Sequence, residues 1–145
     1  MKKTSIALLS ALWFSGLCQA ADFVTLQFGN KTIKAEVAIS AAERQKGLMF
    51  RTSMAKDHGM LFIMDGEESA CMWMKNTKIP LSVAFIDAFG KIINIEDMEP
   101  ETTDIHCSRA PAKYTLEMNK GWFGALDPAK QYEVKGLPLK SVLTY

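Results

Sequence analysis

Short apolar segments alternate with turn signals along this chain, and this succession constrains its fold more than any other feature. Residues 23–28 precede the turn dipeptide Gly29-Asn30, and in residues 31–39 apolar side chains alternate with polar ones. Alternation with a period of two is typical of strands, and such a dipeptide between two strands is typical of a hairpin. About eight segments of this kind predict a mainly β (α+β) fold, a compact single-domain β-barrel or sandwich.

The other expected strands have the same character, and one of them contains an acidic residue. In residues 112–118, the side chains of Tyr114, Leu116 and Met118 point to one face, which leaves Glu117 on the opposite face. Turn signals such as Asp65-Gly66 separate these segments. We expect the remaining strands at residues 59–64, 70–75, 81–87, 91–98, 112–118 and 131–135.

One short helix is expected near residues 40–47. Ser40 and Glu43 have the spacing of a capping box, in which each side chain accepts a hydrogen bond from the other residue's backbone N–H. Gly47 is placed to end the helix after about two turns. Residues 121–124 are expected to begin a compact turn or a second short helix.

The first 20 residues have the layout of a secretory signal peptide. Lys2 and Lys3 form a positive start, residues 6–17 form an apolar run, and Cys18-Gln19-Ala20 is a small-x-small ending. A lipidated Cys18 is the alternative, but Leu17 stands directly before the cysteine instead of three positions ahead of it. We therefore expect residues 1–20 to be a cleaved signal peptide.

Cleavage would leave residues 21–145 as a single domain, exported to the periplasm or secreted. No later segment is long and apolar enough to span a bilayer. The full chain has 17 Lys and Arg against 16 Asp and Glu, a formal charge of +1, and loss of the two leader lysines takes this charge to −1. Since no run of basic residues is present, we expect no nucleic-acid partner. We also expect a monomer.

Two cysteines, Cys71 and Cys107, remain after cleavage. In an exported protein such a pair favours a disulfide, whereas two unrelated buried thiols are the alternative. The separation of their Cα atoms decides between these interpretations, and the spacing along the chain leaves both open.

The chain contains none of the standard catalytic signatures. It has no Gly-x-Ser-x-Gly, no phosphate-binding glycine loop, no dinucleotide fingerprint and no zinc spacing of Cys and His. We therefore assign no cofactor and no metal ligands. Whether the protein is an enzyme stays open.

Polar residues at the ends of apolar segments, or within them, provide the candidate ligand site. Arginine offers a planar fork of donors for a carboxylate or phosphate, while asparagine and threonine orient a ligand. We predict a cleft for a small polar or anionic ligand, and structural ion pairs and caps are the alternative. If Asp87 or Glu117 lies near Lys75, proton transfer becomes feasible, which would make the protein an envelope enzyme. The candidate ligand-binding residues are Glu43, Arg51, Lys75, Asn76, Thr77, Asp87, Ser108 and Glu117.

Methionine is abundant, which raises copper handling as a further alternative. Met72 and Met74 share one face of the strand expected at 70–75, and thioether and thiolate ligands suit Cu(I). Methionine is also an adaptable core residue, and core packing is the competing interpretation. Trp73 is expected to be a core residue.

Five ordered blocks resemble the domain of unknown function 192 family (DUF192, also called UPF0127), over about residues 23–135. The resemblance implies a small exported or membrane-tethered protein with a compact β-rich fold, and it implies no established activity. The chain departs from the family pattern at Met72, where an aromatic or aliphatic residue is usual, and at Ser82, where an acidic residue is common. Cys71 and Cys107 are not motif positions. The blocks are Glu43-Arg44-x-x-Gly47-Leu48-Met49-x-Arg51, Gly59-Met60-Leu61-Phe62, Trp73-Met74-Lys75-Asn76-Thr77-x-Ile79-Pro80-Leu81, Phe85-Ile86-Asp87-x-x-Gly90 and Ser108-x-x-Pro111-Ala112-x-Tyr114-x-Leu116-Glu117.

Overall fold

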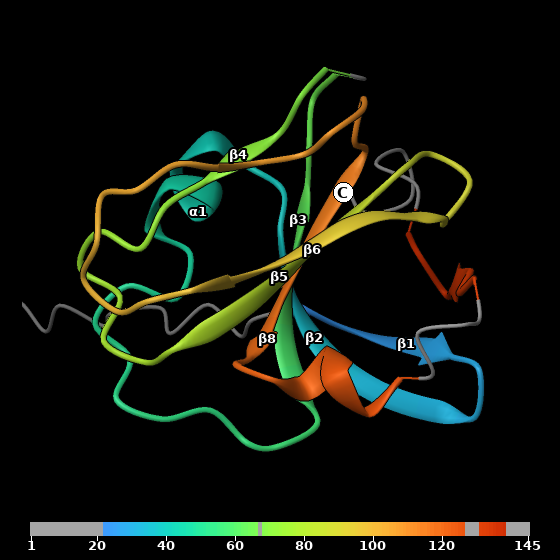
Figure 1. The fold of residues 1–145 in the computed structure, drawn as a ribbon, viewed down its shortest axis with the longest axis horizontal. Coiled ribbons are helices and arrows are strands. Elements are labelled where there is room, and N and C mark those ends of the chain that lie inside the picture. Colours follow the sequence, from blue (N-terminus) through green and yellow to red (C-terminus); the bar gives the residue numbers. More distant parts are fainter. Residues whose placement is uncertain (1–21, 67, 127–130, 139–145) are drawn as a thin grey trace, which may run out of the picture.

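A computed structural model describes residues 22–66, 68–126 and 131–138 of the chain (Figure 1). The expected signal peptide lies outside the described residues. Within them, no helix is long and apolar enough to cross a bilayer.

Seven strands form one curled sheet in the order β6-β5-β8-β3-β2-β1-β9. All neighbours are antiparallel except β2 and β3, whose parallel pairing requires the crossover that contains the helix α1 (Ala41–Lys46). The sheet is curled into a half-barrel. An isolated antiparallel bridge between Lys91 and Glu133 links residues next to its two outer strands. Its strands are β1 (Phe23–Phe28), β2 (Lys31–Ala38), β3 (His58–Ile63), β5 (Leu81–Ile86), β6 (Ile92–Met98), β8 (Tyr114–Asn119) and β9 (Val134–Lys135).

A smaller layer covers one face of this sheet. It contains α1 and a two-stranded sheet of β4 (Cys71–Met72) and β7 (His106–Cys107), and Figure 1 shows α1 and β4 together on one side of the long strands. The 3₁₀ helix η1 (Trp122–Ala125) follows β8.

The central strands are buried on both faces, which produces two cores. All six residues of β5 are buried, with Ala84 and Ile86 in the first core and Val83 and Phe85 in the second. The first core fills the curl of the sheet and includes Leu61, Leu116 and Trp122 among its residues. The second lies beneath α1 and β4. The predicted β-rich single-domain fold is therefore confirmed.

The helix predicted near residues 40–47 is also confirmed. The Ser40 hydroxyl accepts a hydrogen bond from the Glu43 N–H at 3.2 Å, and the Glu43 carboxylate accepts one from the Ser40 N–H at 2.8 Å. Gly47 ends the helix at φ +45°, where a side chain would press against the Phe62 ring.

The prediction for residues 70–75 was wrong in its extent. The strand β4 is only two residues long, and the chain then turns, with the Thr77 N–H bonded to the Met74 carbonyl at 3.0 Å. Asn76 adopts a left-handed conformation at φ +57°, which extended backbone cannot include. As a result Trp73 is 42 % exposed, and the expectation of a core residue fails.

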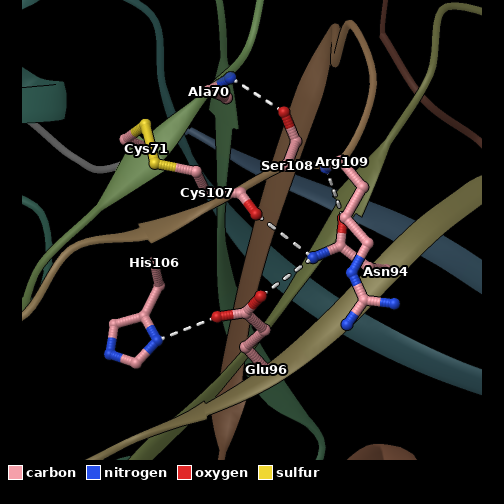
Figure 2. The surroundings of a disulfide bond; sticks show 8 residues. All are labelled: Ala70, Cys71, Asn94, Glu96, His106, Cys107, Ser108 and Arg109. Atoms are coloured by element: carbon pink, nitrogen blue, oxygen red, sulfur yellow. Dashed lines mark hydrogen bonds and ion pairs between the residues drawn. A yellow bond between two sulfur atoms is a disulfide. The ribbon is translucent and has the colours of Figure 1, made fainter.

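Cys71 and Cys107 form a disulfide that joins β4 to β7, with their Cα atoms 4.1 Å apart (Figure 2). Side chains also link this two-stranded sheet of β4 and β7 to β6. Asn94 donates to the Cys107 carbonyl at 3.2 Å, and a ring nitrogen of His106 lies 3.0 Å from a Glu96 carboxylate oxygen. The strand β7 lies outside every strand segment that the sequence predicts.

Candidate functional site

Glu117 lies at the centre of the sheet, on the face covered by the smaller layer. Its neighbours Leu116 and Met118 belong to the first core, so the alternation of β8 turns Glu117 toward the opposite face. Met60 and Val83 stand opposite it on the adjoining strands. Only 4 % of Glu117 is exposed.

The Glu117 carboxyl takes part in no hydrogen bond or salt bridge among the described residues. Its oxygens keep a little solvent contact, since no fully buried side-chain oxygen or nitrogen of the described residues lacks a partner. Burial raises the pKa of this carboxyl from 4.5 to about 8, so the group is mostly neutral at pH 7. A buried carboxyl without a hydrogen-bond partner destabilises the folded state, because the group loses its hydrogen bonds to water and gains none in the protein. An arrangement of this kind is a candidate for a binding or catalytic group.

The carboxyl borders a small cavity of about 30 Å³, which has room for about one water molecule. Thr77 is buried, with 5 % of the residue exposed. Its hydroxyl donates a hydrogen bond to the Lys75 carbonyl at 3.4 Å. The cavity is lined by Arg44, Gln45, Lys46, Gly47, Leu48, Met49, Phe62, Met72, Trp73, Thr77 and Glu117.

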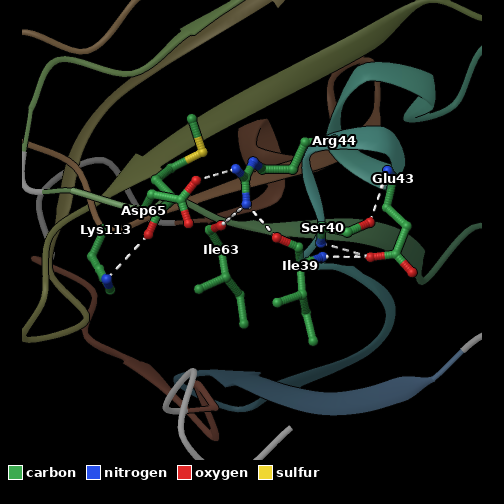
Figure 3. A network of polar contacts seen from close by, with 8 residues as sticks. Ile39, Ser40, Glu43, Arg44, Ile63, Asp65 and Lys113 are labelled. Atoms are coloured by element: carbon green, nitrogen blue, oxygen red, sulfur yellow. Dashed lines mark hydrogen bonds and ion pairs between the residues drawn. The ribbon is translucent and has the colours of Figure 1, made fainter. Parts of the chain in front are cut away.

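Arg44 borders the cavity, but its guanidinium is engaged elsewhere (Figure 3). It donates to the carbonyls of Ile39 and Ile63, the latter at 3.0 Å, and forms a salt bridge with Asp65. These contacts fasten α1 to the ends of β2 and β3. The Arg44 guanidinium therefore makes no hydrogen bond or salt bridge with Glu117, although both residues line the cavity.

Two aromatic rings stand exposed beside this cavity. Trp73 lines it and carries the Lys75 ammonium 5.3 Å from its ring centroid. Phe50 follows the lining residue Met49 and is 63 % exposed. We call Phe50, Trp73, Lys75 and Asn76 the rim.

The rim contains backbone strain. Phe50 and Asn76 both have positive φ, +66° and +57°, and the Phe50 N–H donates to the Asn76 carbonyl at 2.9 Å. A bulky residue in this region is uncommon, and such strain is concentrated at functional sites. Two strained turns therefore hold each other beside the cavity.

Four of the predicted site residues meet here. Thr77 and Glu117 line the cavity, whereas Lys75 and Asn76 contact the lining residues Trp73 and Met49. The Asn76 amide lies 4.0 Å from the Met49 sulfur.

Glu43 and Arg51 line a different hollow, of about 210 Å³, which borders α1 but does not include Glu117. Arg51 donates to the Glu36 carboxylate with both terminal guanidinium nitrogens, Nη1 and Nη2, and these hydrogen bonds raise the pKa of Arg51. Backbone N–H groups of Ser40 and Ile39 lower the pKa of the Glu43 carboxyl. Both side chains already have partners within the fold.

Asp87 and Ser108 are placed in structural roles. One oxygen of Asp87 accepts hydrogen bonds from the N–H groups of Phe89 and Lys91, each at 2.9 Å, and so caps the turn after β5. This turn lies at the opposite end of β5 from the segment that contains Lys75, so the structure does not bring the two together. The Ser108 hydroxyl accepts from the Ala70 N–H at 2.9 Å (Figure 2).

A larger hollow of about 480 Å³ was not anticipated from the sequence. Three lysines line it, Lys31, Lys56 and Lys120, and its wall includes Trp122, whose indole donates to Asp57 at 3.0 Å. These residues come from separate segments of the chain, and no local pattern marks them. Phe50 was missed as well, because it directly follows Leu48 and Met49 and so reads as one more core residue.

Comparison with known proteins gives the chain a family. Residues 24–135 match the model of DUF192, which is described only as "Uncharacterized ACR". The chain belongs to the DUF192 family. A search of curated proteins finds no match.

Two solved structures resemble this DUF192 protein over most of its length. One, from Sinorhizobium meliloti 1021, is named as a candidate transcription regulator; it is 33 % identical with a TM-score of 0.76, and the match covers 81 % of this chain and 95 % of that one. The other, from Novosphingobium aromaticivorans DSM 12444, is named as a protein of unknown function; it is 28 % identical with a TM-score of 0.70, covering 92 % and 99 %.

Proposed function

We propose that this DUF192 protein is an exported, monomeric binding module for a small polar ligand, which inserts one polar group against Glu117. The observation that carries the proposal is the buried carboxyl itself. Glu117 lines a cavity and its carboxyl has no partner among the described residues, so a ligand group that enters the cavity would supply the hydrogen bond that the fold does not provide.

The size of the cavity defines how such a ligand binds. About 30 Å³ accepts one small group and no more, so the rest of the ligand lies outside, over the rim. Trp73 and Phe50 offer ring faces there at 42 % and 63 % exposure, and Lys75 and Asn76 offer polar contacts. Aromatic faces beside polar groups suit a compact polar molecule with one apolar side.

The Cys71–Cys107 disulfide supports the exported location, because such bonds persist in oxidising compartments. It also bears on copper handling, since neither cysteine offers a free thiolate while the bond is intact.

Thermal unfolding of the purified protein with a panel of polyols, sugars, amino acids and short peptides tests the proposal. A ligand at 100 times its Kd stabilises the folded state by about 2.7 kcal/mol, which raises the Tm measurably. We expect at least one compound to raise the Tm of the wild type and to lose this effect in Glu117→Gln. The matched control is Lys56→Ala, which alters the lysine-lined hollow. A panel without any binder, or binders that ignore Glu117→Gln, would contradict the proposal.

An anionic ligand would require the other location. Lys31, Lys56 and Lys120 surround a hollow within the usual size range of ligand sites, and Asn119 adds an amide there. Binding that is lost in Lys56→Ala and kept in Glu117→Gln would assign the ligand to that hollow.

A further inference from the structure

We infer that the group entering the Glu117 cavity is a primary ammonium, and that the ligands of this site are small primary amines. The inference rests on the proposed function, because it names the class of ligand for the same cavity. Nothing in the family description addresses it.

Four of the side chains that line the cavity can accept hydrogen bonds: Glu117, Thr77, Met49 and Met72. Glu117 offers its carboxyl oxygens. The Thr77 hydroxyl gives its hydrogen to the Lys75 carbonyl and keeps its lone pairs. Met49 and Met72 add thioether sulfurs, which are weak acceptors. A guest in the cavity therefore gains most by bringing donors, and an ammonium brings three.

The cationic residues that border the cavity do not supply this group. The Arg44 guanidinium is held by two carbonyls and by Asp65, and Lys46 is exposed on α1. Lys75 does not line the cavity, and its ammonium lies 5.3 Å from the centroid of the Trp73 ring. On the sheet side, Met60, Val83 and Thr115 surround Glu117 without a titratable group. The carboxyl accordingly stays free for a guest cation.

The size and the walls of the cavity favour an ammonium over a larger cation. Its volume of about 30 Å³ matches a group about as large as one water molecule. Trp73 lines the cavity, and its indole ring attracts cations, as the Lys75 ammonium 5.3 Å from the ring centroid illustrates. A hydroxyl of the same size would carry one donor instead of three and no charge.

Amine binding must then be coupled to proton release. The empty site holds a proton on Glu117 at pH 7, because burial raises the pKa of this carboxyl to about 8. An ammonium that pairs with the carboxylate displaces this proton. Affinity should therefore rise about tenfold from pH 6 to pH 7 and level off above pH 8.

The test compares benzylamine with benzyl alcohol, which have the same ring for the rim and differ in the inserted group. Isothermal titration of the purified protein at pH 7, in two buffers of different ionisation enthalpy, measures both affinity and proton release. We expect benzylamine to bind at least tenfold more tightly and to release about one proton. Glu117→Gln should abolish this preference, and Lys56→Ala should preserve it.

Other outcomes separate the two proposals. Equal affinities for amine and alcohol, or polar binders from the panel combined with no benzylamine binding, would overturn the ammonium assignment and leave the proposed function intact. Absence of every binder would overturn both. Silver nitrate binding that is lost in both Met72→Leu and Glu117→Gln, without amine binding, would assign the cavity to a soft metal ion and overturn the inference.

Discussion

At the scale of single residues, the cost of Glu117 is the most informative quantity in this protein. A carboxyl that is buried and unpartnered is tolerated only in its neutral form, so the folded state carries a proton that the unfolded chain gives up at lower pH. This residue was named from the sequence as a polar interruption of a strand. Its lack of partners was not predictable, because that depends on every segment packed above it.

Glu117→Gln should change how stability depends on pH. The pKa of Glu117 is raised, so the folded protein binds more protons than the unfolded chain between pH 4.5 and about 8. Wild-type stability should therefore fall across this window by up to about 1.4 kcal/mol per pH unit, and glutamine should remove this fall. Urea unfolding at pH 5, 6, 7 and 8 measures the effect.

Glu43→Gln is the matched control for this experiment. The pKa of Glu43 is lowered, so its contribution is present above pH 4.5 and is lost only in more acidic solution. Between pH 5 and 8 this variant should run parallel to the wild type. Parallel curves for Glu117→Gln as well would mean that Glu117 is solvated in the folded protein.

Trp73 and Met74 are adjacent, but their truncation to alanine should destabilise the protein to different extents. Met74 is fully buried in the second core, and Met74→Ala should cost about 2–5 kcal/mol. Trp73 is 42 % exposed, so Trp73→Ala should cost well under the 3–5 kcal/mol of a core tryptophan. Chemical denaturation of the two variants decides, and a larger loss for Trp73→Ala would show that its ring packs as a core residue.

At the scale of elements, local signals were read correctly and remote ones were not. The helix α1 was predictable because Ser40, Glu43 and Gly47 fix it within eight residues. The end of β4 was not, because its only strand partner is β7, and the disulfide joins residues 36 positions apart. The pair of cysteines suggested the bond, but only the pairing of β4 with β7 brings their Cα atoms within reach.

Reduction of the disulfide, or the double variant Cys71→Ser with Cys107→Ser, should destabilise the protein by about 3–4 kcal/mol. The bond closes a loop over a sequence separation of 36, and the estimate follows from the entropy of that loop in the unfolded chain. Guanidinium unfolding with and without reductant measures the difference. Because β4 contains Met72 and leads directly into Trp73, which both line the cavity, reduction should also weaken ligand binding. Unchanged binding would mean that the second core alone orders this segment.

At the scale of the whole molecule, the sheet has two working faces. Ser82 illustrates the separation, because its hydroxyl donates to Asp97 and accepts from the Gly121 N–H on the face opposite Glu117. The departure from the family pattern at Ser82 therefore does not alter the Glu117 cavity. The β-rich class followed from period-two alternation, which each segment carries by itself. The cavity combines α1, residues 72–77 and β8, and no periodicity reports which of them converge.

The attachment of α1 makes a specific prediction about access to Glu117. None of the six residues of α1 is buried, and Arg44 links it to two carbonyls and to Asp65. Arg44→Met should loosen this roof without touching the carboxyl. We expect association and dissociation of benzylamine to become faster together in stopped-flow experiments, with a smaller change in Kd. A changed Kd with unchanged rates would contradict this.

The Arg44 guanidinium attaches α1 to the sheet, and the strength of this attachment depends on the salt concentration. Salt screens an exposed ion pair such as that of Arg44 with Asp65, whereas the packing beneath Leu48 is indifferent to it. Ligand entry and exit should therefore be faster at high salt concentration and slower at low salt concentration. Surroundings whose ionic content varies would, through this ion pair, set the rate of ligand exchange.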